Sequence, residues 1–132
     1  MATIDRLVGA TNQHDLESMA ACFSEDYKNE TPAHPARGFR GRAQVRRNWE
    51  QIFAFVPDIR VEVVRSAVNT GTVWTEWEMR GTRRDGRPHW TRGVIVFGVN
   101  HDAIRWARFY VEPVDESDAT VDDAIRAQVV GQ

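Results

Sequence analysis

The sequence is poor in cysteine, in lysine and in long hydrophobic runs. The single Cys22 cannot form a disulfide within the chain, and no Cys/His spacing typical of a metal site is present. No segment approaches the ~18 consecutive apolar residues of a membrane span. The N-terminus lacks the basic flank and the continuous apolar run of a signal peptide. These absences predict a cytoplasmic protein without a membrane segment, a structural metal or a cofactor.

Net charge is also small, at −2 over 132 residues. Of the 17 basic residues only Lys28 is a lysine, and acidic residues are spread through the whole chain. This composition provides no general positive field for nucleic acid. Because 42% of the residues are hydrophobic, the chain can bury one core of ordinary size. We therefore expect a single domain over residues 1–132 without a nucleic-acid partner.

Three helices are predicted in the first half of the chain, because apolar residues recur there at intervals of three and four. Asp15 is a plausible N-cap of the second helix, and Pro57 ends the third. The residues that form the three stripes are Ile4, Leu7, Val8 and Thr11; Leu16, Met19, Ala20 and Phe23; and Val45, Asn48, Trp49, Ile52 and Phe53.

From residue 59 the hydrophobic period changes to two, which is typical of strands. Long strands are predicted at 59–68, 72–84, 88–99 and 103–113, joined by turns at 69–71, 85–87 and 100–102. Residues 114–132 form an extension with a helix capped by Ser117 or Asp118. Helices followed by an antiparallel meander predict an α+β fold, with the helices on one face of a twisted sheet.

The segment "DYKNETPAHPARGFRG", residues 26–41, joins these two halves. Tyr27, Asn29 and Thr31 alternate as on one face of a short strand, and two prolines then break the pattern. A strand at the rim of a pocket, followed by a loop that covers it, would explain both features. Within the loop, "RGFRGR" at 37–42 is suggestive of anion binding, although a lid and a helix start are its more typical roles.

The motifs "FSEDY", "GRAQV", "PDIRVEV", "EWEMRGT", "RGVIVF" and "AIRWARFYVE" occur in that order. Over about residues 4–112 this series resembles the SnoaL-like branch of the nuclear transport factor 2-like superfamily. The resemblance implies a cone-shaped α+β barrel, in which a curved antiparallel sheet wraps around N-terminal helices and encloses a mostly apolar pocket. It also implies a homodimer through the outer face of the sheet. Members include polyketide cyclases, limonene epoxide hydrolases and ketosteroid isomerases, so the fold does not define the chemistry.

The resemblance also phases the strands against the third helix. The side chains that it directs toward the pocket are Tyr27, Asn29, Thr31, Trp49, Ile52, Trp77, Met79, His89, Thr91, Phe109 and Val111. The opposite face then carries aromatic and charged residues that are typical of cross-strand ladders or of an interface. A register error of one residue would reverse this assignment and bring Glu76, Glu78, Arg92 and Glu112 into the cavity.

The residues of known family chemistries are replaced in this chain. Epoxide hydrolases of this fold use an Asp–Arg–Asp arrangement, and the matching positions carry Trp77, Met79 and Phe109, which cannot activate water. The acid of the cyclases also corresponds to Phe109, and no inward base carboxylate of the isomerase type is evident. The candidates that remain are His89 as general base, with Tyr27 and Asn29 orienting a carbonyl group.

The sequence thus predicts a pocket for a small hydrophobic molecule that bears a carbonyl group. Two interpretations stay open. The protein is either an isomerase or cyclase that uses these groups, or a non-catalytic ligand-binding or protein-interaction domain of the same fold.

Overall fold

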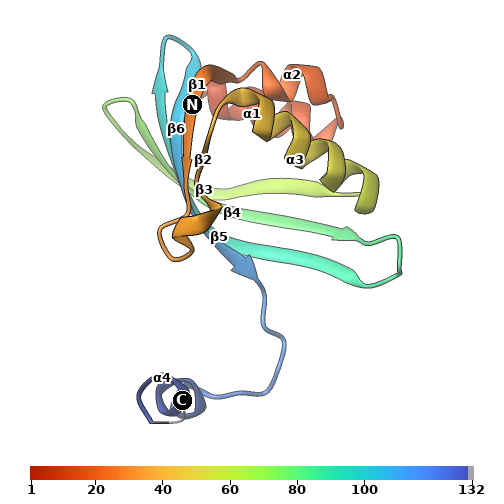
Figure 1. Cartoon of the computed structure of the whole chain (residues 1–132), viewed down its shortest axis with the longest axis vertical. Helices are drawn as coiled ribbons and strands as arrows, with labels where there is room; N and C mark the ends of the chain where they lie inside the picture. The colour runs from red at the N-terminus through yellow and green to blue at the C-terminus, as the bar shows by residue number, and fades with distance from the viewer. Residues whose placement is uncertain (131–132) are drawn as a thin grey trace.

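The structure, a computed structural model, describes residues 1–130 and has an α+β fold. Helices α1, α2 and α3 lie against one side of a strongly curved sheet (Figure 1). The elements are α1 (Ala2–Asn12), α2 (Leu16–Ala20), β1 (Phe23–Glu30), the 3₁₀ turn η1 (Pro35–Arg37), β2 (Phe39–Arg40), α3 (Arg42–Phe55), β3 (Arg60–Asn69), β4 (Thr72–Thr82), β5 (Pro88–Asn100), β6 (Ala103–Pro113) and α4 (Val121–Val129). The fold class predicted from the sequence is confirmed.

The sheet has six strands in the order β2-β1-β6-β5-β4-β3, and it is curved but not closed. Strands β3 to β6 form the predicted antiparallel meander, in which Gly93 of β5 pairs with both Trp77 and Val111. Two features differ from the expected all-antiparallel sheet. Strand β1 runs parallel to β6, and the two-residue β2 adds an antiparallel edge beside β1. A parallel pair requires a long crossover, which here is the whole segment from α3 to β5.

Local chemistry sets the ends of the helices. The Asp15 carboxylate accepts the Ser18 amide at 3.1 Å and caps α2, as predicted. Helix α3 begins after Gly41, whose φ of 98° favours glycine, and ends two residues before Pro57. Helix α2 is shorter than its apolar stripe suggests, because the chain turns after Ala20 and Phe23 already belongs to β1.

The core lies between the helices and the concave face of the sheet. Its fully buried side chains come from both layers and include Ile4, Tyr27, Ile59, Phe97 and Ile104. Helix α1 contributes its predicted stripe to this core, since Ile4, Leu7 and Thr11 are all buried. Helix α3 packs against β1, and α1 packs against β3.

The C-terminal extension lies apart from this body. Helix α4 follows an extended segment and lies away from the sheet (Figure 1), and all its residues are exposed. Its N-cap is Thr120, which forms a capping box with Asp123, so the predicted cap at Ser117 or Asp118 is wrong. The Ser117 hydroxyl instead accepts the Ala119 amide in the turn before the helix. Among residues 1–130, no helix combines the length and apolar character that a membrane crossing requires.

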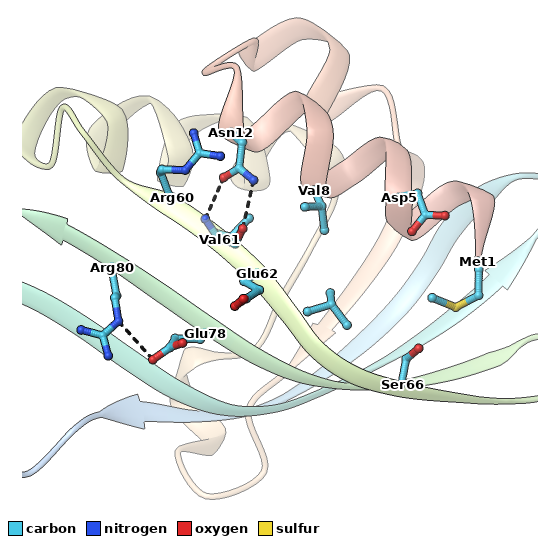
Figure 2. A pocket seen from close by; sticks show the side chains of 11 residues that line it. Met1, Asp5, Val8, Asn12, Arg60, Val61, Glu62, Ser66, Glu78 and Arg80 are labelled. Atoms are coloured by element: carbon cyan, nitrogen blue, oxygen red, sulfur yellow. Dashed lines mark hydrogen bonds and ion pairs between the residues drawn. The ribbon is translucent and has the colours of Figure 1, made fainter.

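The outer edge of β3 is partly covered by side chains. The Asn12 carboxamide bonds with both backbone groups of Val61, donating to the carbonyl at 3.0 Å and accepting the amide at 2.7 Å (Figure 2). The imidazole Nε2 of His14 lies 2.8 Å from the Ile59 carbonyl oxygen. These contacts satisfy groups that an edge strand otherwise leaves open.

Candidate functional site: an apolar cavity with two oriented amides

A cavity of about 280 Å³ lies between α3, the inner face of β1, the η1–β2 segment and the strands β4 and β6. Among residues 1–130, its lining is mostly apolar and aromatic, with four further polar side chains and no carboxylate. The lining residues are Phe23, Tyr27, Asn29, Thr31, Arg37, Phe39, Val45, Asn48, Trp49, Ile52, Met79, Phe109 and Val111. An apolar hollow with few placed polar groups is the usual form of a small-molecule site.

Eight of the side chains predicted to face a pocket line this cavity. The period of two brings residues from β1, β4 and β6 to one face, and the helical spacing in α3 adds two more. These eight are Tyr27, Asn29, Thr31, Trp49, Ile52, Met79, Phe109 and Val111.

Tyr27 and Asn29 form a hydrogen-bonded pair on β1. The Tyr27 side chain is 0% exposed, and its hydroxyl donates to the Asn29 carboxamide oxygen at 2.7 Å. Burial raises the pKa of Tyr27 well above its ordinary value, so the phenol stays a neutral donor at physiological pH. The NH₂ group of Asn29 makes no hydrogen bond within residues 1–130, so it is free to donate to a ligand. The Tyr27 hydroxyl is thus committed to Asn29 instead of to a ligand.

A second amide in the cavity is oriented in the same way. Gln44 donates its side-chain N–H to the Asn48 oxygen at 2.7 Å, and Arg47 donates to the Gln44 oxygen at 2.7 Å. This chain along α3 leaves the Asn48 NH₂ group as a donor without a partner in the described residues. Asn48 lies on the predicted inward stripe of α3 but was not assigned to the site.

The loop before β2 adds Arg37 to the lining. Its guanidinium makes no ion pair or hydrogen bond with any described residue, and it is the only charged group among the lining residues. The "RGFRGR" pattern was the sequence signal for this residue. The cavity is also lined by Phe23, Phe39 and Val45. The side on which Phe39 lies is not predictable from the sequence, because the prolines interrupt the strand pattern before it.

Trp77, Thr91 and His89 do not line the cavity. Trp77 is 3% exposed and packs in the core, with its ring centroid 5.9 Å from that of Phe97. Thr91 is buried on β5, and His89 begins that strand opposite Gly81. Strand alternation predicts the face on which a residue lies but not its depth along a curved sheet. Burial, and then the charge of Arg83, lower the pKa of His89 below its ordinary value.

The charged residues that a reversed phasing of the strands would bring into the cavity do not line it among residues 1–130, and each has a polar or charged partner elsewhere. The Trp90 indole donates to Glu78 at 2.7 Å, which lowers the pKa of that carboxyl group. Arg92 lies 3.5 Å from Glu76 and 3.7 Å from Glu78. The imidazole Nε2 of His34 lies 2.7 Å from the carboxylate Oε1 of Glu112.

A larger hollow of about 760 Å³ lies between α1 and the outer edge of β3 (Figure 2). It is an open groove in which carboxylates and guanidinium groups are mixed, including Asp5, Glu62, Arg60 and Arg80. The lining of this groove is much more charged than that of the smaller cavity, so the smaller cavity is the better candidate site for a hydrophobic molecule. Among residues 1–130 there is no group of three His, Cys, Asp or Glu side chains that could hold a metal ion.

Solved structures with this fold include proteins of several functions. IdmH from Streptomyces antibioticus, a candidate polyketide cyclase, is 23% identical with a TM-score of 0.71, over 85% of this chain and 89% of that one. RV0760c from Mycobacterium tuberculosis, in complex with estradiol-17beta-hemisuccinate, is 18% identical with a TM-score of 0.71, over 83% and 90%. An epoxide hydrolase from the same organism, similar to limonene epoxide hydrolase, is 17% identical with a TM-score of 0.72, over 84% and 80%. At these identities the likeness concerns the fold alone.

No curated protein matches the chain. The model of the SnoaL-like domain matches residues 4–109, which includes α1 to α3 and nearly all of the sheet. The chain therefore belongs to the SnoaL-like family.

Proposed function

We propose that the protein binds a small hydrophobic molecule with a carbonyl group in the cavity between α3 and β1. The observation that carries this proposal is the Tyr27–Asn29 pair, which holds an amide donor at the wall of a mostly apolar hollow. A ligand carbonyl that accepts from the Asn29 NH₂ group would replace a hydrogen bond that water otherwise supplies. Its apolar body would contact Trp49, Ile52 and Phe109.

Related structures support a small-molecule ligand in general terms. One with the ketosteroid isomerase-like fold, from Catenulispora acidiphila, contains trimethylamine, and RV0760c contains a steroid hemisuccinate. These ligands differ widely, so the identity of the ligand of this chain has to be derived from its own cavity.

The lining favours binding and orientation over proton transfer. A general base must lie within hydrogen-bond reach of the proton that it removes, and none of the lining residues is His, Asp or Glu. The oriented amides can stabilise negative charge on a carbonyl oxygen, which is one half of isomerase or cyclase chemistry. An isomerase or cyclase would need His89 to act from outside the lining, so the non-catalytic ligand-binding function is the better supported of the two.

A calorimetric titration with 2-acetonaphthone tests the proposal. Replacement of Asn29 by Ala should weaken binding by about 0.5–1.5 kcal/mol, or roughly 2- to 13-fold, because one neutral hydrogen bond is lost. The matched control is Asn100→Ala at the exposed end of β5, which should bind the ketone as the wild type does. The proposal fails if the wild type does not bind the ketone, or if both variants bind it equally well.

A further inference from the structure

We propose that the ligand of this cavity is a hydrophobic anion, such as an aromatic or alicyclic carboxylate, whose charged oxygens bind Arg37 and the amides of Asn29 and Asn48. This inference rests on the proposed function and narrows its ligand class. It follows from the kinds of polar group that the cavity presents and from the surroundings of Arg37.

The polar groups of the cavity are almost entirely donors. The oxygen of Asn29 accepts from Tyr27 and the oxygen of Asn48 accepts from Gln44, whereas neither NH₂ group has a hydrogen-bond partner within residues 1–130. Two of the described lining residues carry a hydroxyl. That of Tyr27 donates to Asn29, whereas that of Thr31 can donate to a ligand or accept from one. A ligand rich in hydrogen-bond donors would find few acceptors here. A ligand with two acceptor oxygens could instead accept from the unpaired N–H groups of the cavity.

The charge of the cavity also favours an anionic ligand. Arg37 is the one charged lining residue, and its guanidinium has no anionic partner within residues 1–130. The carboxylate of Glu112 lies 2.7 Å from the imidazole of His34 and makes no hydrogen bond or ion pair with Arg37 among the described residues. Arginine presents a planar fork of N–H groups that matches a carboxylate in two parallel hydrogen bonds.

The position of Arg37 relative to Asn29 is fixed by the backbone. Phe39, two residues after Arg37, pairs with Asn29 in the β1–β2 ladder. Gly38 lies so close to β1 that a Cβ atom there would come within 3.3 Å of the Asn29 carbonyl oxygen. This close approach places the backbone of the loop that carries Arg37 beside the strand that carries Asn29.

The test compares two ligands of nearly equal shape, 2-naphthoate and 2-acetonaphthone, by calorimetry at low and high salt. The wild type should bind naphthoate at least tenfold more tightly than the ketone. Replacement of Arg37 by Met should abolish this preference, because it should weaken naphthoate binding much more than ketone binding. Added salt should weaken naphthoate binding to the wild type only. Arg37 is exposed, so the variant is expected to fold, and its thermal unfolding is measured alongside.

Arg40→Met is the matched control, because Arg40 lies on the same short segment but does not line the cavity. It should keep the preference for naphthoate. If ketone and naphthoate bind the wild type equally, the anion inference fails and the proposed function stands. If Arg40→Met loses the preference as Arg37→Met does, the attraction comes from the surface, and the inference also fails. If neither ligand binds, the proposed function fails and the inference fails with it.

Discussion

At the scale of single residues, the buried hydroxyl of Tyr27 links stability to ligand recognition. We predict that Tyr27→Phe lowers the free energy of unfolding by about 1 kcal/mol, because the Asn29 oxygen loses its buried donor. Urea unfolding measures this change. Tyr110→Phe is the control, since Tyr110 is 45% exposed on the outer face and its hydroxyl makes no hydrogen bond within the described chain. Equal stability of both variants and the wild type would contradict the structural role given to the Tyr27–Asn29 bond.

The same pair shows how far the sequence predicts the site. The alternation of Tyr27, Asn29 and Thr31 placed all three on one face, which the structure reproduces. Alternation does not reveal that Tyr27 donates to Asn29, because two residues on one strand face contact each other only when their rotamers allow it. Arg37 could not be placed either, since a loop without periodicity has no predicted direction.

At the scale of helices and strands, the turns made the meander predictable. The "NTG", "DGR" and "NHD" segments separate β3 to β6 at the expected points, and the predicted strand ends agree with the structure within about two residues. The pairing of β1 with β6 could not be predicted from these signals, because it joins segments about 80 residues apart. Strand β2 has two residues and therefore no period to read.

The cap of α4 gives a prediction at this scale. Thr120→Ala should reduce the helicity of residues 121–129, because a lost N-cap costs about 1 kcal/mol of helix stability. The global midpoint of thermal unfolding should not change, since the residues of α4 are exposed and do not pack on the body. Backbone chemical shifts measure the first effect and calorimetry the second.

The control for this cap is Ser117→Ala, which removes the hydroxyl that accepts the Ala119 amide before the helix begins. It should leave the chemical shifts of residues 121–129 as they are. Loss of helicity in Ser117→Ala but not in Thr120→Ala would show that the helix begins earlier than Thr120.

At the scale of the whole molecule, the outer face of the sheet is the surface to explain. It carries Trp74, which is 51% exposed, together with Tyr110 and the partly exposed Trp90 and Trp106. A large aromatic area on a surface is typical of an interaction site. We propose that two copies of the chain associate through this face.

Sedimentation at micromolar concentration tests the association. The wild type should sediment at about 30 kDa, twice the 15.1 kDa of one chain. Trp74→Glu should sediment as a monomer, because a buried and unpaired charge at the interface is costly. Phe55→Glu is the control, since Phe55 is exposed at the end of α3, away from this face. A wild-type species of 15.1 kDa would contradict the proposal.

The Asn12 carboxamide on the edge of β3 has a consequence for behaviour at high concentration. A strand edge with open backbone groups is a template on which further chains can add, and such growth has no natural end. Asn12 occupies the backbone groups of Val61, and His14 occupies the Ile59 carbonyl, so incoming chains find this stretch already filled. We therefore expect the Asn12 side chain to hinder the addition of further chains to β3. Its removal should make a concentrated solution aggregate sooner.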